Sequence, residues 1–340
     1  MLKFLLIFKS VAVYLLFSGI VFADSEMSFE QEPQDDQGVK IEVNVGEAKR
    51  IKLQFNGLLQ AWYVNHSEEL DQFRMRRSEL KLKGNVSEGI DFFVMVDPTK
   101  KDKLFSDFGL SLNHIPYIKL TAGQFKIPVS LEGIQSSGEL ETVERAYVSK
   151  TLGDKRDVGA KVEGECAPIK LKYIVGVFNG EGENADEKND QKDVAGMLMW
   201  MPVKELNIVG SYYEGEQGIH SQAKRRYGAG VRFERGSILI KGEYLEGKDV
   251  DVEADGWYVL AAYRLDELGY EVLKPVQLVV RYEEWIPNRD KSDCLNVWTV
   301  GGNYFLDPKY SKLQLDGLLM DGQGSFEGGV GVTAGWEIKF

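Results

Sequence analysis

Cations at alternate positions of apolar segments are the side chains of this chain that could do chemistry together. Residues two apart in an extended segment lie on one face, so such cations would line a single surface. Lysine and arginine replace the hydration water of an anion without holding it tightly, which passage through a channel requires. We therefore predict an anion path made of Lys81, Lys119, Lys126, Arg145, Lys161, Lys170, Lys172 and Arg226. For any single cation, a solvated charge that keeps a lumen wet is the simpler interpretation.

Four acids lie in residues 126–155, the longest internal segment without strand-like alternation. A connection of this length is typical of a functional loop. If it folds into a lumen, its acids face the cations and create a transverse field that filters solutes by size and charge. The predicted acids of this constriction loop are Glu132, Glu139, Glu141 and Glu144. An extracellular loop remains the alternative, and the acids argue against strict phosphate selectivity.

Catalytic and metal chemistry find little support in the sequence. The three histidines, His66, His114 and His220, show no metal-type spacing. A serine or aspartate beside His66 or His220 could act in a hydrolase, but no nucleophile motif is present. We expect no enzyme, no metal and no cofactor. Acidic stretches at 181–190 and 249–255 leave a structural or adhesive protein that binds cations or lipopolysaccharide as another alternative.

The elements that would position these residues are β-strands. In Gly329–Phe340 every even position is apolar or aromatic, and the odd positions are Gly, Thr, Glu and Lys, which indicates a strand with two different faces. Sixteen segments show this pattern: 50–65, 72–86, 88–98, 104–113, 116–126, 155–166, 168–179, 193–202, 204–215, 223–234, 236–246, 256–266, 275–287, 295–305, 310–320 and 328–340. Phe73 to Arg77 break the alternation and suggest a bulge. Val194 to Met201 are apolar on both faces.

Composition limits the class of protein. The chain has 340 residues, 43% of them hydrophobic, a net charge of −12 and a mean hydropathy of −0.27. The negative charge argues against nucleic acid as a partner. No apolar run after residue 23 approaches the ~20 residues that a membrane helix needs. Alternating strands average to a mild hydropathy, so a membrane β-barrel stays possible.

The connections favour that barrel. Short connections, such as 113–116 and 202–204, alternate with longer ones, including 126–155 and 179–193, as in outer-membrane barrels. Seven aromatic residues near strand ends predict interfacial girdles: Trp62, Tyr212, Tyr244, Trp257, Trp298, Tyr304 and Trp336. We predict an all-β, transmembrane, antiparallel up-and-down barrel over residues 50–340. About sixteen strands (fourteen to eighteen) would enclose a water-filled channel instead of a packed core.

The N-terminal residues predict export. Residues 1–23 combine Lys3 and Lys9, an apolar stretch and a small-residue ending at Ala23, the pattern of a cleaved signal peptide; an uncleaved anchor is the alternative. Residues 24–49 form an acidic tail that we expect to be partly disordered, with a possible strand over 41–45. The expected location is the outer membrane of a Gram-negative-type bacterium, in contact with its lipid and lipopolysaccharide.

Several segments resemble the phosphate-selective porin O and P family. They are Arg77–Gly84, Ala122–Pro128, Leu131–Gly133, Glu144–Ala146, Arg156–Gly159 and Gly176–Gly180, in matching order and spacing along residues 50–215. The most specific is Gly-Gln-Phe-Lys-x-Pro, from Gly123 to Pro128. The resemblance implies a sixteen-stranded outer-membrane porin, commonly trimeric, with an in-folded third long loop and passive diffusion of anions such as phosphate. A non-selective diffusion porin remains the alternative.

The two cysteines test the strand order. The strand pattern places Cys166 at a turn and Cys294 in a loop at the opposite end of the barrel. A disulfide needs Cα atoms within about 7 Å, so we predict no bridge within the chain.

Overall fold

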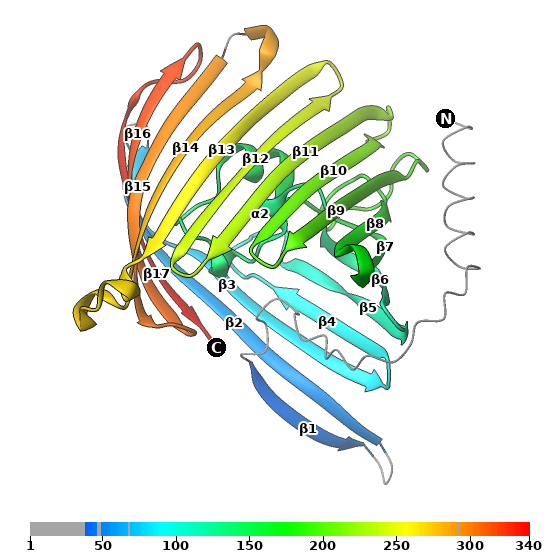
Figure 1. The fold of residues 1–340 in the computed structure, drawn as a ribbon. Helices are drawn as coiled ribbons and strands as arrows, with labels where there is room; N and C mark the ends of the chain where they lie inside the picture. The colour runs from blue at the N-terminus through cyan, green and yellow to red at the C-terminus, as the bar shows by residue number, and fades with distance from the viewer. Residues whose placement is uncertain (1–37, 46–48, 67–68, 292) are drawn as a thin grey trace. The chain divides into compact units, whose positions relative to one another are not determined.

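In the computed structural model, which describes residues 38–45, 49–66, 69–291 and 293–340, antiparallel strands close into a barrel. Each of β2 to β17 pairs with its neighbours in sequence, and the β9–β10 pairing has a register shift between Leu206 and Ile208. The last strand, β17, pairs with β2 and completes the ring (Figure 1). Closure leaves the barrel strands without an open edge, so their backbone amides find partners within the sheet.

The sixteen barrel strands in this part of the chain correspond one to one with the predicted segments. Their bounds are β2 Lys49–His66, β3 Glu69–Ser87, β4 Ile90–Val96, β5 Phe105–Ile115, β6 Ile118–Lys126, β7 Arg156–Cys166, β8 Leu171–Phe178, β9 Asp193–Val203, β10 Leu206–Gln217, β11 Gln222–Arg235, β12 Ile238–Asp249, β13 Val252–Arg264, β14 Val276–Asn288, β15 Asp293–Asp307, β16 Ser311–Gln323 and β17 Gly329–Lys339. The predicted fold class is therefore confirmed. We call the end where β2 begins the turn end and the opposite end the loop end.

A further strand, β1 (Val39–Val45), pairs with the first half of β2, as the sequence suggested near 41–45. It lies below the end of β17, since the backbone of Phe340 pairs with Gly57 and Val39 pairs with Phe55. Residues 1–23 and most of the acidic tail, for which the sequence predicts a signal peptide and partial disorder, lie outside the described residues.

The predicted bulge lies in β3. Gln60 pairs with Arg77 and Ala61 pairs with Met75, so Arg76 is the extra residue. This insertion changes which side chains face the interior, because a register shift of one residue turns a strand over.

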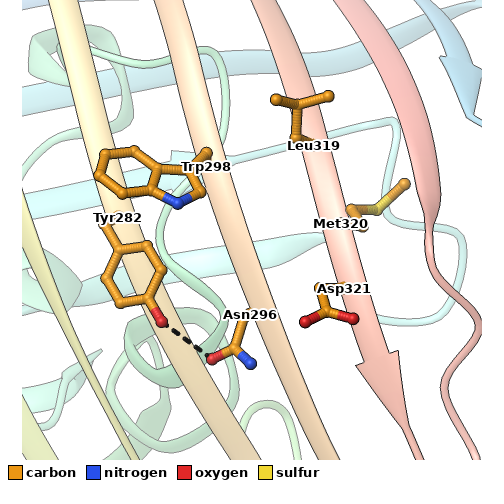
Figure 2. A pocket seen from close by; sticks show the side chains of 6 residues that line it. All are labelled: Tyr282, Asn296, Trp298, Leu319, Met320 and Asp321. Atoms are coloured by element: carbon orange, nitrogen blue, oxygen red, sulfur yellow. Dashed lines mark hydrogen bonds between the residues drawn. The ribbon is translucent and has the colours of Figure 1, made fainter.

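The outer face of the barrel is a band of exposed apolar side chains, among them Leu110, Leu198, Val300 and Leu319. Aromatic side chains form a row toward the loop end, where Trp257 contacts Tyr282 and Tyr282 contacts Trp298. Figure 2 shows a shallow pocket in which this row meets polar side chains. Its lining residues are Tyr282, Asn296, Trp298, Leu319, Met320 and Asp321.

The girdle prediction is wrong for Trp62. Its side chain is only 3% exposed and packs against Val64 and Val143 inside the barrel. The bulge in β3 and the loop that carries Val143 create this interior site.

The interior is less open than predicted. Residues 127–155, which join β6 to β7 and are here called the β6–β7 loop, lie within the barrel; Figure 1 shows their short helix α2 (Leu131–Ile134) behind β12 and β10. Their apolar side chains form a core with inward residues of β12 to β15, such as Val148 with Tyr258 and Trp285. Leu131 packs on Met197 and Val209, which explains why β9 is apolar on both faces. One part of the lumen is thus a packed core, because the loop supplies an apolar surface that alternation within strands does not reveal.

The long connections at 127–155 and 179–192 are both present, and the other loop-end connections are shorter. Cys166 ends β7 at the turn end and Cys294 lies in β15 at the loop end, both as free cysteines. In the described part of the chain, no helix is long and apolar enough to cross a membrane.

Candidate functional site

The Gly-Gln-Phe-Lys-x-Pro segment forms the root of the β6–β7 loop. Gly123 has a φ of +141°, and a Cβ there would overlap the carbonyl oxygen of Phe108. The side-chain amide of Gln124 donates to the backbone carbonyls of Phe105 and Ser106 at 2.8 and 2.9 Å. Lys126 donates to the carbonyls of Gly133 and Gln135 at 2.7 and 3.0 Å. The segment therefore bends β6 and ties its end to the first turn of the loop.

Arg145 braces the loop internally. Its guanidinium donates to the carbonyls of Glu132 and Gln135 and lies 3.2 Å from Asp154. Asp154 also pairs with Lys126 at 3.2 Å, so one carboxylate joins the start and the end of the loop. Since the Arg145 side chain is fully buried, its predicted place in an open anion path is wrong: it supports the loop that shapes the path.

Three inward acids of the wall hold the loop backbone. Glu243 of β12 accepts from the amides of Leu131 and Glu132 at 2.5 and 3.3 Å and from the hydroxyl of Ser130. Glu283 of β14 accepts from the amide of Tyr147 at 2.6 Å. Asp316 of β16 accepts from the amide of Val143 at 2.7 Å.

Three cations on the same strands complete these contacts. Lys241 of β12 lies 3.0 Å from Glu132 and 2.6 Å from Glu141. Arg281 of β14 donates to the hydroxyl of Thr142 and the carbonyl of Glu144, and Lys312 of β16 donates to the carbonyl of Leu140. A cation and an acid on each of three alternate strands therefore fix the loop to one side of the barrel.

Two of the predicted constriction-loop acids are buried by this anchoring. Glu132 and Glu141 are 0% and 6% exposed. Arg232 adds a second cation 3.2 Å from Glu141. Burial alone would raise the pKa of Glu141, but Lys241 and Arg232 lower it to about 2. These acids pair with wall cations as predicted, but in buried anchors and not across open water. Glu139 is half-buried, and its backbone carbonyl accepts from Gln135.

The bulge in β3 brings arginines to the free side of the loop. Arg74 and Arg76 lie over the ring of Trp62, with guanidinium carbons 5.4 and 5.3 Å from its centroid. Arg76 reaches Glu144 of the loop at 3.1 Å, whereas Arg77 donates to Gln60 and lies 3.6 Å from Glu79. Because Arg76 is the extra residue of the bulge, the side chains of both Arg76 and Arg77 reach the interior.

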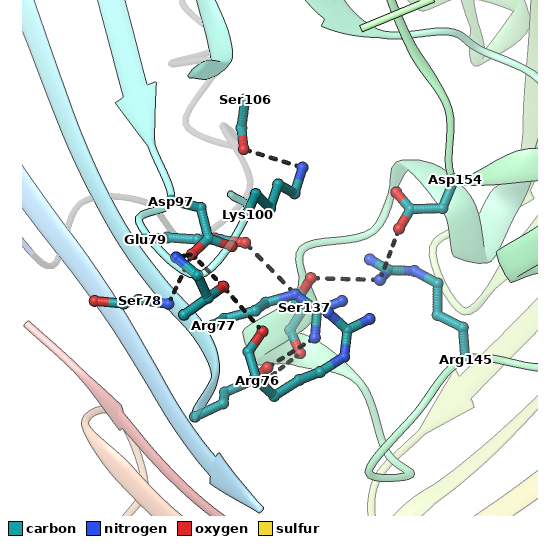
Figure 3. A network of polar contacts seen from close by, with 12 residues as sticks. Arg76, Arg77, Ser78, Glu79, Asp97, Lys100, Ser106, Ser137, Arg145 and Asp154 are labelled. Atoms are coloured by element: carbon teal, nitrogen blue, oxygen red, sulfur yellow. Dashed lines mark hydrogen bonds and ion pairs between the residues drawn. The ribbon is translucent and has the colours of Figure 1, made fainter. Parts of the chain in front are cut away.

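Cations outnumber carboxylates where the free side of the loop meets β3, β5 and β7, a group we call the constriction cluster. Six cations (Arg76, Arg77, Lys126, Arg145, Lys150 and Arg156) share four carboxylates (Glu79, Asp107, Glu144 and Asp154), and Arg74 belongs to the same group through its contact with Trp62. Figure 3 shows Arg76 and Arg77 of β3 opposite Arg145 and Asp154 of the loop.

The electrostatics of this cluster are dominated by its cations. Burial alone would raise the pKa of Glu144, but Lys150 and Arg76 lower it to about 2. Burial would likewise raise the pKa of Asp154, yet Lys126 and Arg145 hold it well below its usual range. Both carboxylates therefore stay ionised at neutral pH.

The other predicted cations lie apart from this cluster. Lys119 and Lys161 both approach Glu163, at 3.6 and 2.6 Å, and Lys172 lies 3.8 Å from Glu165. Lys81 is half-buried on β3 opposite Asn56.

Two placements differ from the prediction. Lys170 is not on a strand: with a φ of +53° it ends the short helix of the β7–β8 turn and is exposed. Arg226 of β11 pairs with Asp249 at 2.7 Å near the loop end, away from the cluster. Because Ala167–Ile169 form this helix, β8 begins at Leu171, three residues later than predicted.

The prediction missed Arg74, Arg76, Arg77 and Arg156 as members of the cluster. The break in alternation at Phe73–Arg77 was the signal for the first three, because a bulge in a strand re-aims its side chains. Arg156 lies beside Lys126 in the sheet, and it pairs with Asp107 at 2.7 Å.

Among the described residues, His, Cys, Asp and Glu form no group of three or more that could hold a metal ion.

Comparisons with known proteins agree with this architecture. The model of the family described as phosphate-selective porin O and P matches residues 50–216, which confirms the resemblance. Curated protein sequences give no significant match.

Solved structures of outer-membrane proteins share the fold at low identity. An anion-selective porin from Comamonas acidovorans has a TM-score of 0.62 and 12% identity, covering 85% of this chain and 100% of its own. The trimer form of OmpT from Vibrio cholerae has a TM-score of 0.62 and 12% identity, covering 85% and 99%. The outer membrane channel DcaP of Acinetobacter baumannii has a TM-score of 0.61 and 10% identity, covering 85% and 97%.

Proposed function

Since the chain is an outer-membrane β-barrel porin whose residues 50–216 match the phosphate-selective porin O and P family, we propose that it carries small anions, phosphate among them, by passive diffusion. The observation that carries this proposal is the constriction cluster, where six cations share four carboxylates; the buried Arg145 acts there as a support of the loop, and Arg74 adds a further positive charge beside Trp62. A porin is a channel and not an enzyme, so the solute needs only a favourable path.

The path runs between the free side of the β6–β7 loop and the wall formed by β3, β5 and β7. The opposite side is closed by the apolar core that the loop shares with β12 to β15. Anchoring on β12, β14 and β16 holds the loop in place, so the path keeps a fixed width. The loop is thus the constriction of the channel.

Arginine suits this path because its planar fork contacts two oxygens of a phosphate at once. Arg76 and Lys150 share the single carboxylate of Glu144, so both keep charge to offer to a passing anion. The same carboxylate stops either cation from holding the anion tightly, and release is as necessary as entry. Salt screens charges over ~8 Å, so the field of such a cluster acts within a narrow lumen.

Toward the turn end the selectivity is weaker. Lys119, Lys161 and Lys172 each lie near Glu163 or Glu165, which balances the charge. This balance favours the alternative, a non-selective diffusion porin, for that part of the channel.

The reversal potential of the purified protein in planar bilayers tests the proposal. Under a KCl gradient we expect the sign given by chloride permeation, and phosphate and sulfate added to one side should reduce the chloride current. Arg76→Gln should shift the reversal potential toward zero, while Lys204→Gln in the β9–β10 turn should leave it unchanged. A cation preference in the unaltered protein would refute anion transport.

Assembly and export belong to the same proposal. A homotrimer is supported by the trimer form of OmpT from Vibrio cholerae, which shares the fold. Lipid and lipopolysaccharide are the expected partners of the exposed apolar band, and residues 1–23 are proposed to act as the export signal. Cross-linking in outer-membrane fractions tests the homotrimer, and the N-terminal sequence of the mature protein tests cleavage of the export signal.

A further inference from the structure

The connection between β13 and β14 differs from the other turn-end connections. Residues 265–275 contain two short helices, η4 (Leu265–Leu268) and η5 (Glu271–Leu273), joined by Gly269 with a φ of +78°. Figure 1 shows this gold segment projecting from the lower rim of the barrel. Three of its apolar side chains are strongly exposed: Leu268 at 49%, Tyr270 at 65% and Val272 at 74%.

The segment is folded against the rim. Ser237 in the β11–β12 turn donates to Asp266 at 2.7 Å, and the amide of Phe305 donates to the carbonyl of Pro275 at 2.8 Å. Lys274 pairs with Glu271 at 2.6 Å. The apolar side chains are therefore presented outward by a fixed scaffold.

The height of the segment places it at a membrane boundary. Outward residues above Trp298 are polar, such as Asn296 and Asp321, so Trp298 marks the upper limit of the apolar band. From Trp298 to Tyr304 the strand advances about 20 Å, or ~15 Å along the barrel axis at the usual tilt. An apolar band is ~25 Å tall, so it continues past Tyr304.

The hydrogen bond from the amide of Phe305 to Pro275 places the end of residues 265–275 just past Tyr304, and the segment projects from there toward the lower limit of the band (Figure 1). Exposed apolar residues also lie on the strands next to the segment, since Leu278, Tyr304 and Leu306 on β14 and β15 are 52%, 45% and 52% exposed. The occupant that this continuity indicates is lipid, because the same surface already faces lipid higher on the wall.

We propose that residues 265–275 form an interfacial anchor: Leu268, Tyr270 and Val272 insert among phospholipid headgroups at the turn end of the barrel. Short helices with apolar side chains bind such an interface in proportion to the apolar area that they bury. Tyrosine suits the boundary because its ring is apolar and its hydroxyl stays hydrated. The anchor does not depend on which ions the channel passes.

Spin labels test this placement. Cys166→Ser and Cys294→Ser would remove the native thiols, and Val272→Cys would carry the label in vesicles of phosphatidylethanolamine and phosphatidylglycerol. Lys204→Cys, in another turn at the same end, gives the water-exposed control, and Leu278→Cys on the wall gives the lipid-facing control. The measured quantity is the ratio of collisions with oxygen, which concentrates in lipid, to collisions with a water-soluble nickel chelate.

We expect the ratio at Val272 to be several times that at Lys204 and to approach that at Leu278. A ratio equal to that at Lys204 would overturn the anchor. Shielding of the Val272 label from both reagents would also overturn it, since this indicates a protein contact. Replacement of Leu268, Tyr270 and Val272 by serine should leave the conductance unchanged, because the segment lies outside the lumen.

Discussion

Removal of the Lys241 ammonium should release the β6–β7 loop from its anchor. Lys241 is buried and contacts Glu132 at 3.0 Å and Glu141 at 2.6 Å, both of which are buried carboxylates. Lys241→Met fills a similar volume but leaves Glu132 without this cation and Glu141 with Arg232 alone. Loss of one partner from a buried ion pair costs about 3–5 kcal/mol.

The pKa of Glu141 gives a similar magnitude. Its fall from 4.5 to about 2 corresponds to about 3 kcal/mol, shared between Lys241 and Arg232. A loss of about 3 kcal/mol shifts the equilibrium between docked and undocked loop by roughly a hundredfold. The contacts of Glu243, Glu283 and Asp316 remain, so we expect transient release and not a permanently open loop.

Single-channel recording measures this release. Lys241→Met should show brief openings to a larger conductance, and a protease added to the purified barrel should cut within residues 127–155 faster than in the unaltered protein. Combining Lys241→Met with Glu132→Gln and Glu141→Gln removes the buried charges and should suppress both effects. If Lys241→Met alone left the conductance, the current noise and the rate of cleavage unchanged, the role assigned to these ion pairs would be refuted.

Three further predictions concern selectivity, pH and folding. Arg76→Gln should reduce the anion-to-cation permeability ratio severalfold, and a ratio unchanged relative to Lys204→Gln would contradict the proposed path. Because the pKa of Glu141 is lowered by docking, docking is fully favoured above about pH 4.5 and loses support as the pH falls toward about 2; current noise should therefore rise only below about pH 4.5. Gly123→Ala should reduce the yield of folded barrel, measured by its shift in gel mobility on heating, because of the φ of +141°. Gly210→Ala, where an added Cβ has no neighbour within 4 Å, is the matched control, and an equal yield would refute the strain argument.

The strand pattern could be predicted because it depends on local information. A lipid-facing residue at every second position leaves a period of two in the sequence, and within the described residues the barrel strands follow it, apart from the break in β3 and the two apolar faces of β9. The parity break at Phe73–Arg77 was likewise visible, since a bulge inserts one residue and inverts the alternation. Its consequence for Arg76 and Arg77 required the partner strand, because only pairing with β2 shows which residue is extra.

The interior could not be predicted in the same way. Alternation assigns Lys241 and Arg281 to the lumen correctly, but it does not indicate that the β6–β7 loop covers them. Trp62 appeared to be a girdle residue because aromatic side chains near strand ends usually face the interface. Its actual contacts are with Val143 and two arginines, which come from distant segments.

The loop acids change meaning once these contacts are known. Counted from the sequence, four glutamates within residues 126–155 weaken the case for an anion channel. Glu132 and Glu141 form buried ion pairs with Lys241, and Glu144 pairs with both Arg76 and Lys150. The acids therefore fix the loop in position, and by doing so they hold the cations of β3 and of the loop close together, as the proposed positive constriction requires. The acidity of the loop and the positive charge of the proposed path are consequences of the same set of ion pairs.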